Sequence, residues 1–210
     1  SEGTTWTAHG AHVREVMVAE AKEVTADKVV VLDVKGLIMS DIGRNGTDPS
    51  RLATELQRVA DDPHAVAIVL DMDTPGGEVT ASDEIYHSLR AFHATSAKPV
   101  VACMRSVCAS GGYYIAAATD FILANELSLT GSIGVIVPKY KYTDLLDKIG
   151  VQFDSVKSGE KKDMLSGGVP RTPEEDARMN AYVQTLVDET FERFLAVVAE
   201  GRGLYANADE

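Results

Sequence analysis

The chain has 210 residues, 45% hydrophobic and 25% charged, which is typical of a globular protein with a sizeable core. Its formal net charge of −12 argues against a general nucleic-acid-binding protein. No apolar run reaches the ~18 residues that span a membrane, and the polar start lacks the order of a signal peptide, so this chain itself is expected to be soluble.

The N-terminal 27 residues are expected to be a polar segment followed by a short helix. Residues 1–10 are predicted to be disordered, whereas Val13, Val16 and Met17 recur at helical spacing within residues 11–24. Residues 28–210 show no linker, repeat or low-complexity tract, so they are expected to form a single domain.

Strand and helix patterns alternate along this domain. Strands are predicted at 28–34, 65–72, 98–104, 120–124, 132–137 and 151–156, and helices at 49–60, 79–92, 142–149 and from 172 to about Gly201 or Gly203. The run at 65–72 is almost wholly apolar, which is typical of a strand buried on both faces. Asp48 with Pro49, and Thr172 with Pro173, are predicted helix starts. This alternation predicts an α/β fold with largely parallel strands.

The stretch from Ser106 to Tyr114 is the first candidate for chemistry. Its small residues join a predicted strand to a short helix, a junction that can present Ser110 as a nucleophile beside free backbone N–H groups. It is not a G-x-S-x-G elbow, because Cys108 occupies the first glycine position. The alternative interpretation is that small residues merely permit close packing.

A serine nucleophile needs a base, and two residue types are available. All five histidines precede Ser110 and none lies in a motif, so surface positions are expected for His9, His12, His64, His87 and His93. Lysine is the other possibility if its surroundings hold its pKa down. The region from Lys157 to Leu165 carries three lysines after a predicted strand, although an exposed loop is the more common meaning of such a run.

A third component would be an oxyanion hole made of two backbone N–H groups. The Pro75-Gly76-Gly77 turn ends a buried strand and can direct such groups into a cleft, and Gly111 can supply the second. A plain turn is the alternative. Cys103 and Cys108 are expected to be free buried thiols, since a disulfide would close a tight loop beside Ser110.

Four motifs in order resemble the signal peptide peptidase A (SppA) family of membrane-associated serine proteases. They are Asp73–Gly77, Ser106–Tyr114, Leu129–Val135 and Lys157–Asp163, and the similarity extends from about Val29 to Leu204. Each motif alone is weakly specific, whereas all four at this spacing are strongly so.

The resemblance implies a role for five residues. Ser110 would be the nucleophile and Lys162 the general base. Gly77 and Gly111 would form the oxyanion hole, and Ser132 would orient the lysine amine. No metal or nucleotide cofactor is implied.

The resemblance also implies a Clp/crotonase-like fold of spiral β-β-α units with a long C-terminal helix. Such domains usually assemble into rings, in which neighbouring subunits can contribute to one site. The implied substrates are cleaved signal peptides and other unfolded or membrane-derived peptides. The implied location is the cell membrane, with the catalytic domain outside the cytoplasm.

The sequence departs from the family in two places, and three other functions stay open. The usual N-terminal anchor and the segment after the long helix are absent from these 210 residues. The nearest alternative is a Ser-Lys membrane-linked peptidase acting on stomatin-like proteins. A crotonase-type acyl-CoA enzyme and an inactive scaffold subunit are the others.

Overall fold

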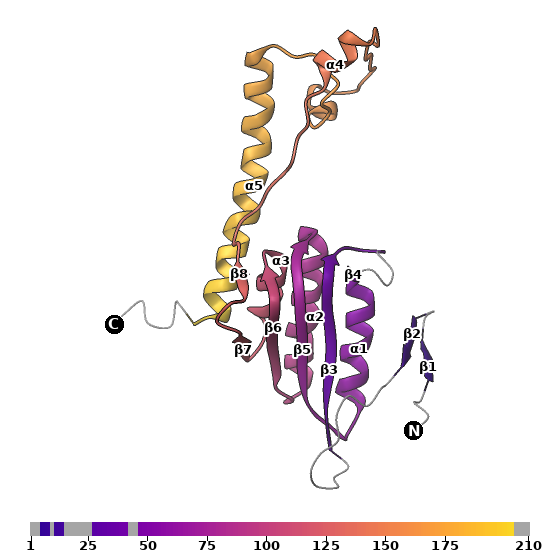
Figure 1. The fold of residues 1–210 in the computed structure, drawn as a ribbon, viewed down its shortest axis with the longest axis vertical. Coiled ribbons are helices and arrows are strands. Elements are labelled where there is room, and N and C mark those ends of the chain that lie inside the picture. The colour runs from indigo at the N-terminus through magenta and orange to yellow at the C-terminus, as the bar shows by residue number, and fades with distance from the viewer. Residues whose placement is uncertain (1–4, 9–10, 15–26, 42–45, 204–210) are drawn as a thin grey trace, which may run out of the picture. The chain divides into compact units, whose positions relative to one another are not determined.

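The computed structural model describes residues 5–8, 11–14, 27–41 and 46–203. The strands are β1 (Thr5–Ala8), β2 (Ala11–Arg14), β3 (Lys28–Ile38), β4 (Gly46–Thr47), β5 (Ala65–Gly77), β6 (Val100–Ala109), β7 (Phe121–Ala124) and β8 (Leu129–Gly131). The helices are α1 (Pro49–Asp61), α2 (Val79–Thr95), α3 (Gly111–Ala116), α4 (Thr143–Lys148), the 3-10 helix η2 (Glu160–Asp163) and α5 (Pro173–Gly201). They belong to two compact units, the first up to Ile133 and from Ala196 onward, the second over Gly134–Leu195 (Figure 1).

The first unit is built on one parallel sheet. Its strand order is β4-β3-β5-β6-β7, with β8 also paired to β6, and every pair is parallel. Helices α1 and α2 cover one face of this sheet (Figure 1). The predicted α/β class with parallel strands is therefore confirmed, and the successive strand–helix units agree with the expected Clp/crotonase-like fold.

The core lies between this sheet and its helices because alternate strand residues point to one face. Its fully or almost fully buried side chains are Leu32, Val34 and Ile38 of β3, Ile68, Leu70 and Met72 of β5, Leu52, Leu56 and Val59 of α1, and Ile85, Leu89 and Phe92 of α2. The opposite face of β3 is open, with Val29 55% and Val31 44% exposed. Burial on both faces, predicted for residues 65–72, holds only in the middle of β5, because Val66 is 43% exposed.

Both predicted helix starts are confirmed. The Asp48 carboxylate accepts a hydrogen bond from the Arg51 N–H at 3.0 Å, and Pro49 opens α1. At α5, the Thr172 hydroxyl accepts from the Glu175 N–H at 3.2 Å while the Glu175 carboxylate accepts from the Thr172 N–H at 2.8 Å. This reciprocal pair is a capping box, which satisfies two N–H groups at the helix start.

The N-terminal predictions are wrong where the structure describes that segment. Thr5–Ala8 is a strand instead of disordered chain, and Ala11–Arg14 is its antiparallel partner instead of the start of a helix. Four residues on either side of a short connection gain more from pairing with each other than from isolated helical turns. The rest of the predicted helix, residues 15–24, lies outside the described residues.

Two predicted strands are also absent from the described structure. Strand β8 ends at Gly131, and the positive φ values of Gly131 (82°) and Ser132 (52°) turn the backbone out of the extended conformation before residues 133–137. Residues 151–156 have the apolar composition of a strand but pair with no described segment, and a strand is stable only within a ladder.

The described helices also bear on the membrane question. None of them combines the length and the apolar character needed to cross a bilayer.

That residues 28–210 act as a single protease domain stays a prediction.

Candidate active site

Ser110 lies in a strained turn between β6 and α3. Its φ of 52° and ψ of −119° are uncommon for a residue other than glycine, and such strain concentrates at functional sites. The Ser110 N–H donates to the Gly131 carbonyl at 2.9 Å, and its carbonyl accepts from the Tyr114 N–H at 3.0 Å. These bonds hold the turn on both sides, so the half-buried Ser110 is presented where the strand ends and the helix begins.

The end of β5 packs directly against this turn. A Cβ atom placed on Gly76 would lie 2.8 Å from the Gly111 nitrogen and 2.9 Å from the Ser110 Cβ, so no side chain fits between the two segments. A Cβ atom on Gly111 would lie 3.5 Å from the Gly77 nitrogen. The structure therefore brings the backbone of Gly77 and Gly111, the two predicted oxyanion donors, close to each other and to Ser110.

Ser132 directly follows Gly131, whose carbonyl oxygen accepts the hydrogen bond from the Ser110 N–H. Strand β8 pairs with the end of β6, with Ala109 opposite Gly131, and the next residue in each segment is a serine. Both serines have a φ of 52°. Four of the five predicted site residues thus belong to one region of the first unit.

Thr74 and Asp73 support this region, and the sequence analysis assigned neither of them a role. The buried Thr74 hydroxyl donates to the Gly36 carbonyl at 2.5 Å and accepts from the Gly76 N–H at 3.1 Å. The Asp73 carboxylate accepts from the Val107 N–H at 3.1 Å. These contacts connect β5 to β3 and β6. Both residues belong to the Asp73–Gly77 motif, which is the sequence signal from which their role could have been predicted.

The helix α3 after Ser110 is anchored by Tyr114. Its hydroxyl donates to the Asp83 carboxylate on α2 at 2.5 Å, and its ring packs edge to face against Tyr86 with the centroids 5.4 Å apart. The ring is 7% exposed. Asp83 and Tyr86 carry no sequence signal beyond their place on an amphipathic helix.

Cys108, two residues before Ser110, lies in surroundings that make its thiol unreactive. Burial, with a smaller effect of the Asp73 carboxylate, raises the pKa of the Cys108 thiol to about 12. The thiol therefore stays protonated at neutral pH and is not a competing nucleophile. Both Cys103 and Cys108 are free, as predicted, but only Cys108 is buried, whereas Cys103 is half-buried.

The described histidines partly match their predicted surface positions. His64 and His87 are exposed, and His87 lies 3.4 Å from the Asp83 carboxylate. His93 is instead half-buried, with its Nε2 3.2 Å from the Ala118 carbonyl oxygen and its Nδ1 3.9 Å from Asp120. His9 lies outside the described residues, and for His12 only the backbone is described, so the predicted surface positions of both side chains stay predictions.

Lys162 belongs to the second unit, on the 3-10 helix η2. Lys157 forms an ion pair with Asp163 at 2.8 Å, and the Lys161 amine lies 3.5 Å from the centre of the Tyr182 ring. The Lys162 amine has no partner among the residues that the structure describes. Of the three lysines in this loop, Lys162 is thus the one whose amine is uncommitted; its proximity to Ser110 stays a prediction.

Comparison with known proteins places this chain among peptidases. The model of peptidase family S49 matches residues 93–209, more than half of the chain. A protein of Enterococcus faecium assigned as a signal peptide peptidase SppA is 35% identical over 187 residues, covering 86% of this chain and 53% of that protein. Protease 4 of Haemophilus influenzae is 32% identical over 181 residues, covering 85% of this chain and 28% of that protein.

A solved structure adds little to these similarities. A serine-to-alanine mutant of the 1510-N membrane-bound stomatin-specific protease is 20% identical with a TM-score of 0.44, covering 84% of this chain and 70% of that one. This likeness is too weak to establish a common fold. The sequence matches are sufficient without it, and with Ser110 at a strained turn beside two glycines they lead to one assignment: the chain belongs to peptidase family S49, the SppA family of serine proteases.

Proposed function

We propose that this chain is a serine endopeptidase in which Ser110 and Lys162 form a catalytic dyad. The observation that carries the proposal is the Ser110 turn, with its positive φ and its contact with Gly76 and Gly77, in a member of a peptidase family. Lys162 is supported as the base because the other two lysines of its loop are engaged by Asp163 and Tyr182.

The first half of the reaction forms an acyl-enzyme. The neutral Lys162 amine takes the proton of the Ser110 hydroxyl as its oxygen attacks the peptide carbonyl carbon. The N–H groups of Gly77 and Gly111 stabilise the negative charge that develops on the carbonyl oxygen. When the carbon–nitrogen bond breaks, the Lys162 ammonium returns the proton to the leaving amine.

The second half releases the acid product. Lys162 takes a proton from a water molecule that attacks the ester, and the bond to the Ser110 oxygen breaks as that oxygen regains the proton. Ser132 would orient the amine through a hydrogen bond, which fits its place beside Gly131. No step requires a metal ion or a nucleotide.

The substrates and the setting are part of the same proposal. Peptide substrates follow from the family, and the name of the E. faecium relative favours cleaved signal peptides. Other unfolded or membrane-derived peptides are included in the proposal because the sequence motifs resemble those of the SppA family. The chain spans only about half of that relative's length. We place the domain at the outer side of the cell membrane, held there by an anchor outside these 210 residues, and in a homo-oligomeric ring.

Substitution of the two dyad residues tests the proposal. Ser110→Ala and Lys162→Ala should each reduce peptide hydrolysis by about 10³-fold or more, because a dyad acts as a unit. A fluorophosphonate probe should label Ser110 in the parent protein, which mass spectrometry of the labelled peptide would locate. Activity should rise toward alkaline pH, because only the neutral amine is a base.

Lys161→Ala is the matched control, since it removes a neighbouring lysine on the same 3-10 helix. It should keep near-normal activity. Near-normal activity of Lys162→Ala, or loss of activity in His87→Ala or His93→Ala, would show that the dyad is wrongly assigned.

A further inference from the structure

The loop that carries Lys162 is held together by the carboxylate of the next residue, Asp163. This carboxylate accepts hydrogen bonds from the Lys157 amine at 2.8 and 3.0 Å and from the Arg171 guanidinium at 3.2 Å. The side chains of Asp163 and Arg171 are only 11% and 9% exposed. The cations, Lys157 first, hold the pKa of the Asp163 carboxyl below its usual range, so it stays ionised at neutral pH.

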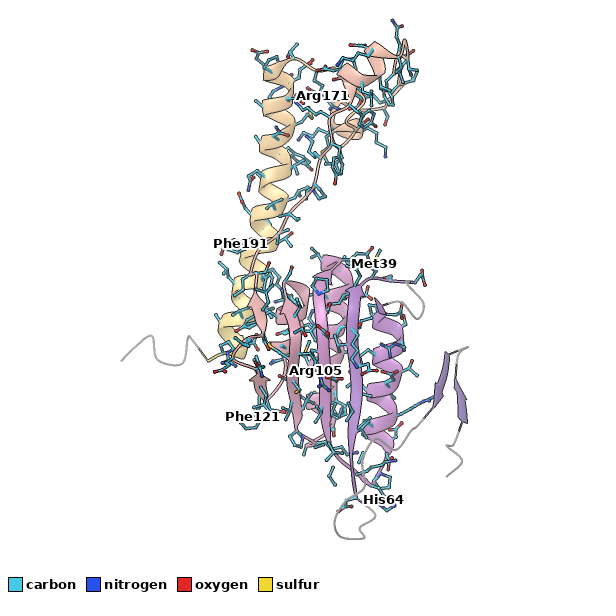
Figure 2. All side chains as sticks on the ribbon, viewed as in Figure 1. Met39, His64, Arg105, Phe121, Arg171 and Phe191 are labelled. Atoms are coloured by element: carbon cyan, nitrogen blue, oxygen red, sulfur yellow. The ribbon has the colours of Figure 1, made fainter. Side chains whose placement is uncertain are left out.

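Arg171 closes the same loop through backbone contacts. The guanidinium of Arg171, the residue labelled in Figure 2, donates to the carbonyl oxygens of Asp163 and Ser166. The Ser166 N–H donates to the Asp163 carbonyl at 2.9 Å. The Lys162 N–H donates to the Gly159 carbonyl at 3.2 Å. The backbone on both sides of Lys162 is therefore fixed within the second unit.

We propose that Asp163 and Arg171 are positioning residues for the Lys162 amine. This inference rests on the proposed function, in which Lys162 is the base. Neither residue touches the reacting atoms: they act by fixing the backbone from which Lys162 extends and by binding Lys157. A lysine has four flexible side-chain bonds, so its amine can be placed reproducibly only when the backbone from which it extends is itself fixed.

The rate of proton transfer from Ser110 depends on where the Lys162 amine lies. A general base must come within hydrogen-bond distance of the hydroxyl whose proton it takes. A misplacement of about 1 Å can reduce the rate by about 100-fold. A loop that carries the base without rigid support would lose rate in the chemical step while leaving substrate binding unchanged.

Asp163→Asn and Glu160→Gln form a matched pair for the test. Both remove one negative charge from the same 3-10 helix, but the Glu160 carboxylate, in the part of the chain that the structure describes, pairs at its exposed position with Arg178 alone, at 3.4 Å. Asp163→Asn should lower kcat by about 10- to 100-fold with KM within about twofold of the parent value. Glu160→Gln should match the parent protein in both constants.

Hydrogen exchange followed by mass spectrometry provides a readout that does not depend on activity. Peptides covering residues 157–168 should exchange faster in Asp163→Asn than in Glu160→Gln, because the ion pairs that hold the loop around the Ser166 amide are weakened. If Asp163→Asn fails to fold, Lys157→Gln should show the same pattern with a smaller loss, since Arg171 then still binds Asp163.

The possible failures can be told apart. An active Lys162→Ala variant would overturn the dyad, whatever the exchange result. An inactive Lys162→Ala variant with Asp163→Asn indistinguishable from Glu160→Gln in kcat would overturn the positioning role and leave the dyad intact. A loss in Asp163→Asn that appears in KM alone would also overturn it.

Discussion

At the residue scale, the site depends on positions where no side chain fits. A Cβ atom on Gly77 would lie 2.0 Å from the Ile38 carbonyl oxygen and 2.7 Å from the Ile38 nitrogen. Both atoms belong to the backbone of a buried strand residue, so neither can rotate away. Gly77 is therefore needed for the close approach of β5 to β3 as well as for its proposed oxyanion role.

Gly77→Ala should lower the free energy of unfolding by about 3 kcal/mol, because the clash must move a strand. Gly159→Ala is the control, since a Cβ atom there meets nothing within 4 Å and the backbone is extended, with a φ of −165°. Urea unfolding of both variants measures the difference. Equal stability of the two variants would contradict this account of the strand contact.

At the element scale, a polar network joins three neighbouring strands on the open face of the sheet. The Asp71 carboxylate of β5 binds Arg105 of β6, which is labelled in Figure 2. It also lies 2.8 Å from the Lys35 amine of β3, which binds Asp33 at 2.7 Å. Asp71 is only 10% exposed at its side chain. Its bond with Arg105 is the largest cause that holds the pKa of the Asp71 carboxyl below its usual value, and Lys35 adds to it against the effect of burial.

This network predicts an acid-sensitive part of the stability. Because the pKa of Asp71 is lower in the folded state, its contribution is complete above about pH 4, the ordinary aspartate value, and is lost as the pH falls through the folded value. Asp71→Asn should cost about 1–2 kcal/mol at pH 7 and much less at pH 2. Urea unfolding at both pH values measures this.

The exposed Asp147 on α4 provides the control. Asp147→Asn makes the same change in charge without entering the sheet network, so its effect should be small at pH 7. A cost of Asp71→Asn that is the same at both pH values would mean that the ion pairs are not its origin.

At the scale of the whole molecule, the second unit exposes several large apolar side chains. Its exposed large side chains include Ile136 at 85%, Tyr140 at 79%, Ile149 at 63% and Val156, which is fully exposed. Where exposed apolar side chains gather into one patch, they usually mark an interface. Residues 151–156, which have strand composition and no described partner strand, belong to the same unit.

This surface favours the proposed homo-oligomer, and its mass can be measured. Light scattering coupled to size exclusion should give a multiple of 22.5 kDa for the parent chain. Val156→Glu should shift the distribution toward the monomer, because a buried unpaired charge is costly. Gln152→Glu adds the same charge at an exposed polar position and should not. A monomeric parent chain at assay concentration would rule out the ring for these 210 residues.

The elements that could be predicted from the sequence are those with strong local signals. The core parts of β3, β5 and β6 follow from apolar runs, α1 and α5 from their caps, and the Ser110 turn from its small residues. The predictions fail where the local sequence pattern favours one structure but the presence or absence of a pairing strand decides another. Residues 151–156 look like a strand but pair with no segment that the structure describes, whereas Thr5–Ala8 and Ala11–Arg14 pair because each provides the other's partner.

The sequence by itself determined the fold class, the family motifs and the candidate residues Ser110, Gly77, Gly111, Ser132 and Lys162. Only the tertiary structure decided that Gly131 binds Ser110, that Asp71 pairs with Arg105, and that Asp163 and Arg171 support the lysine loop. The physical reason is the range of the interactions. Helix caps, turns and periodicity are set by neighbours along the chain, whereas strand pairing and ion pairs depend on segments that only folding brings together.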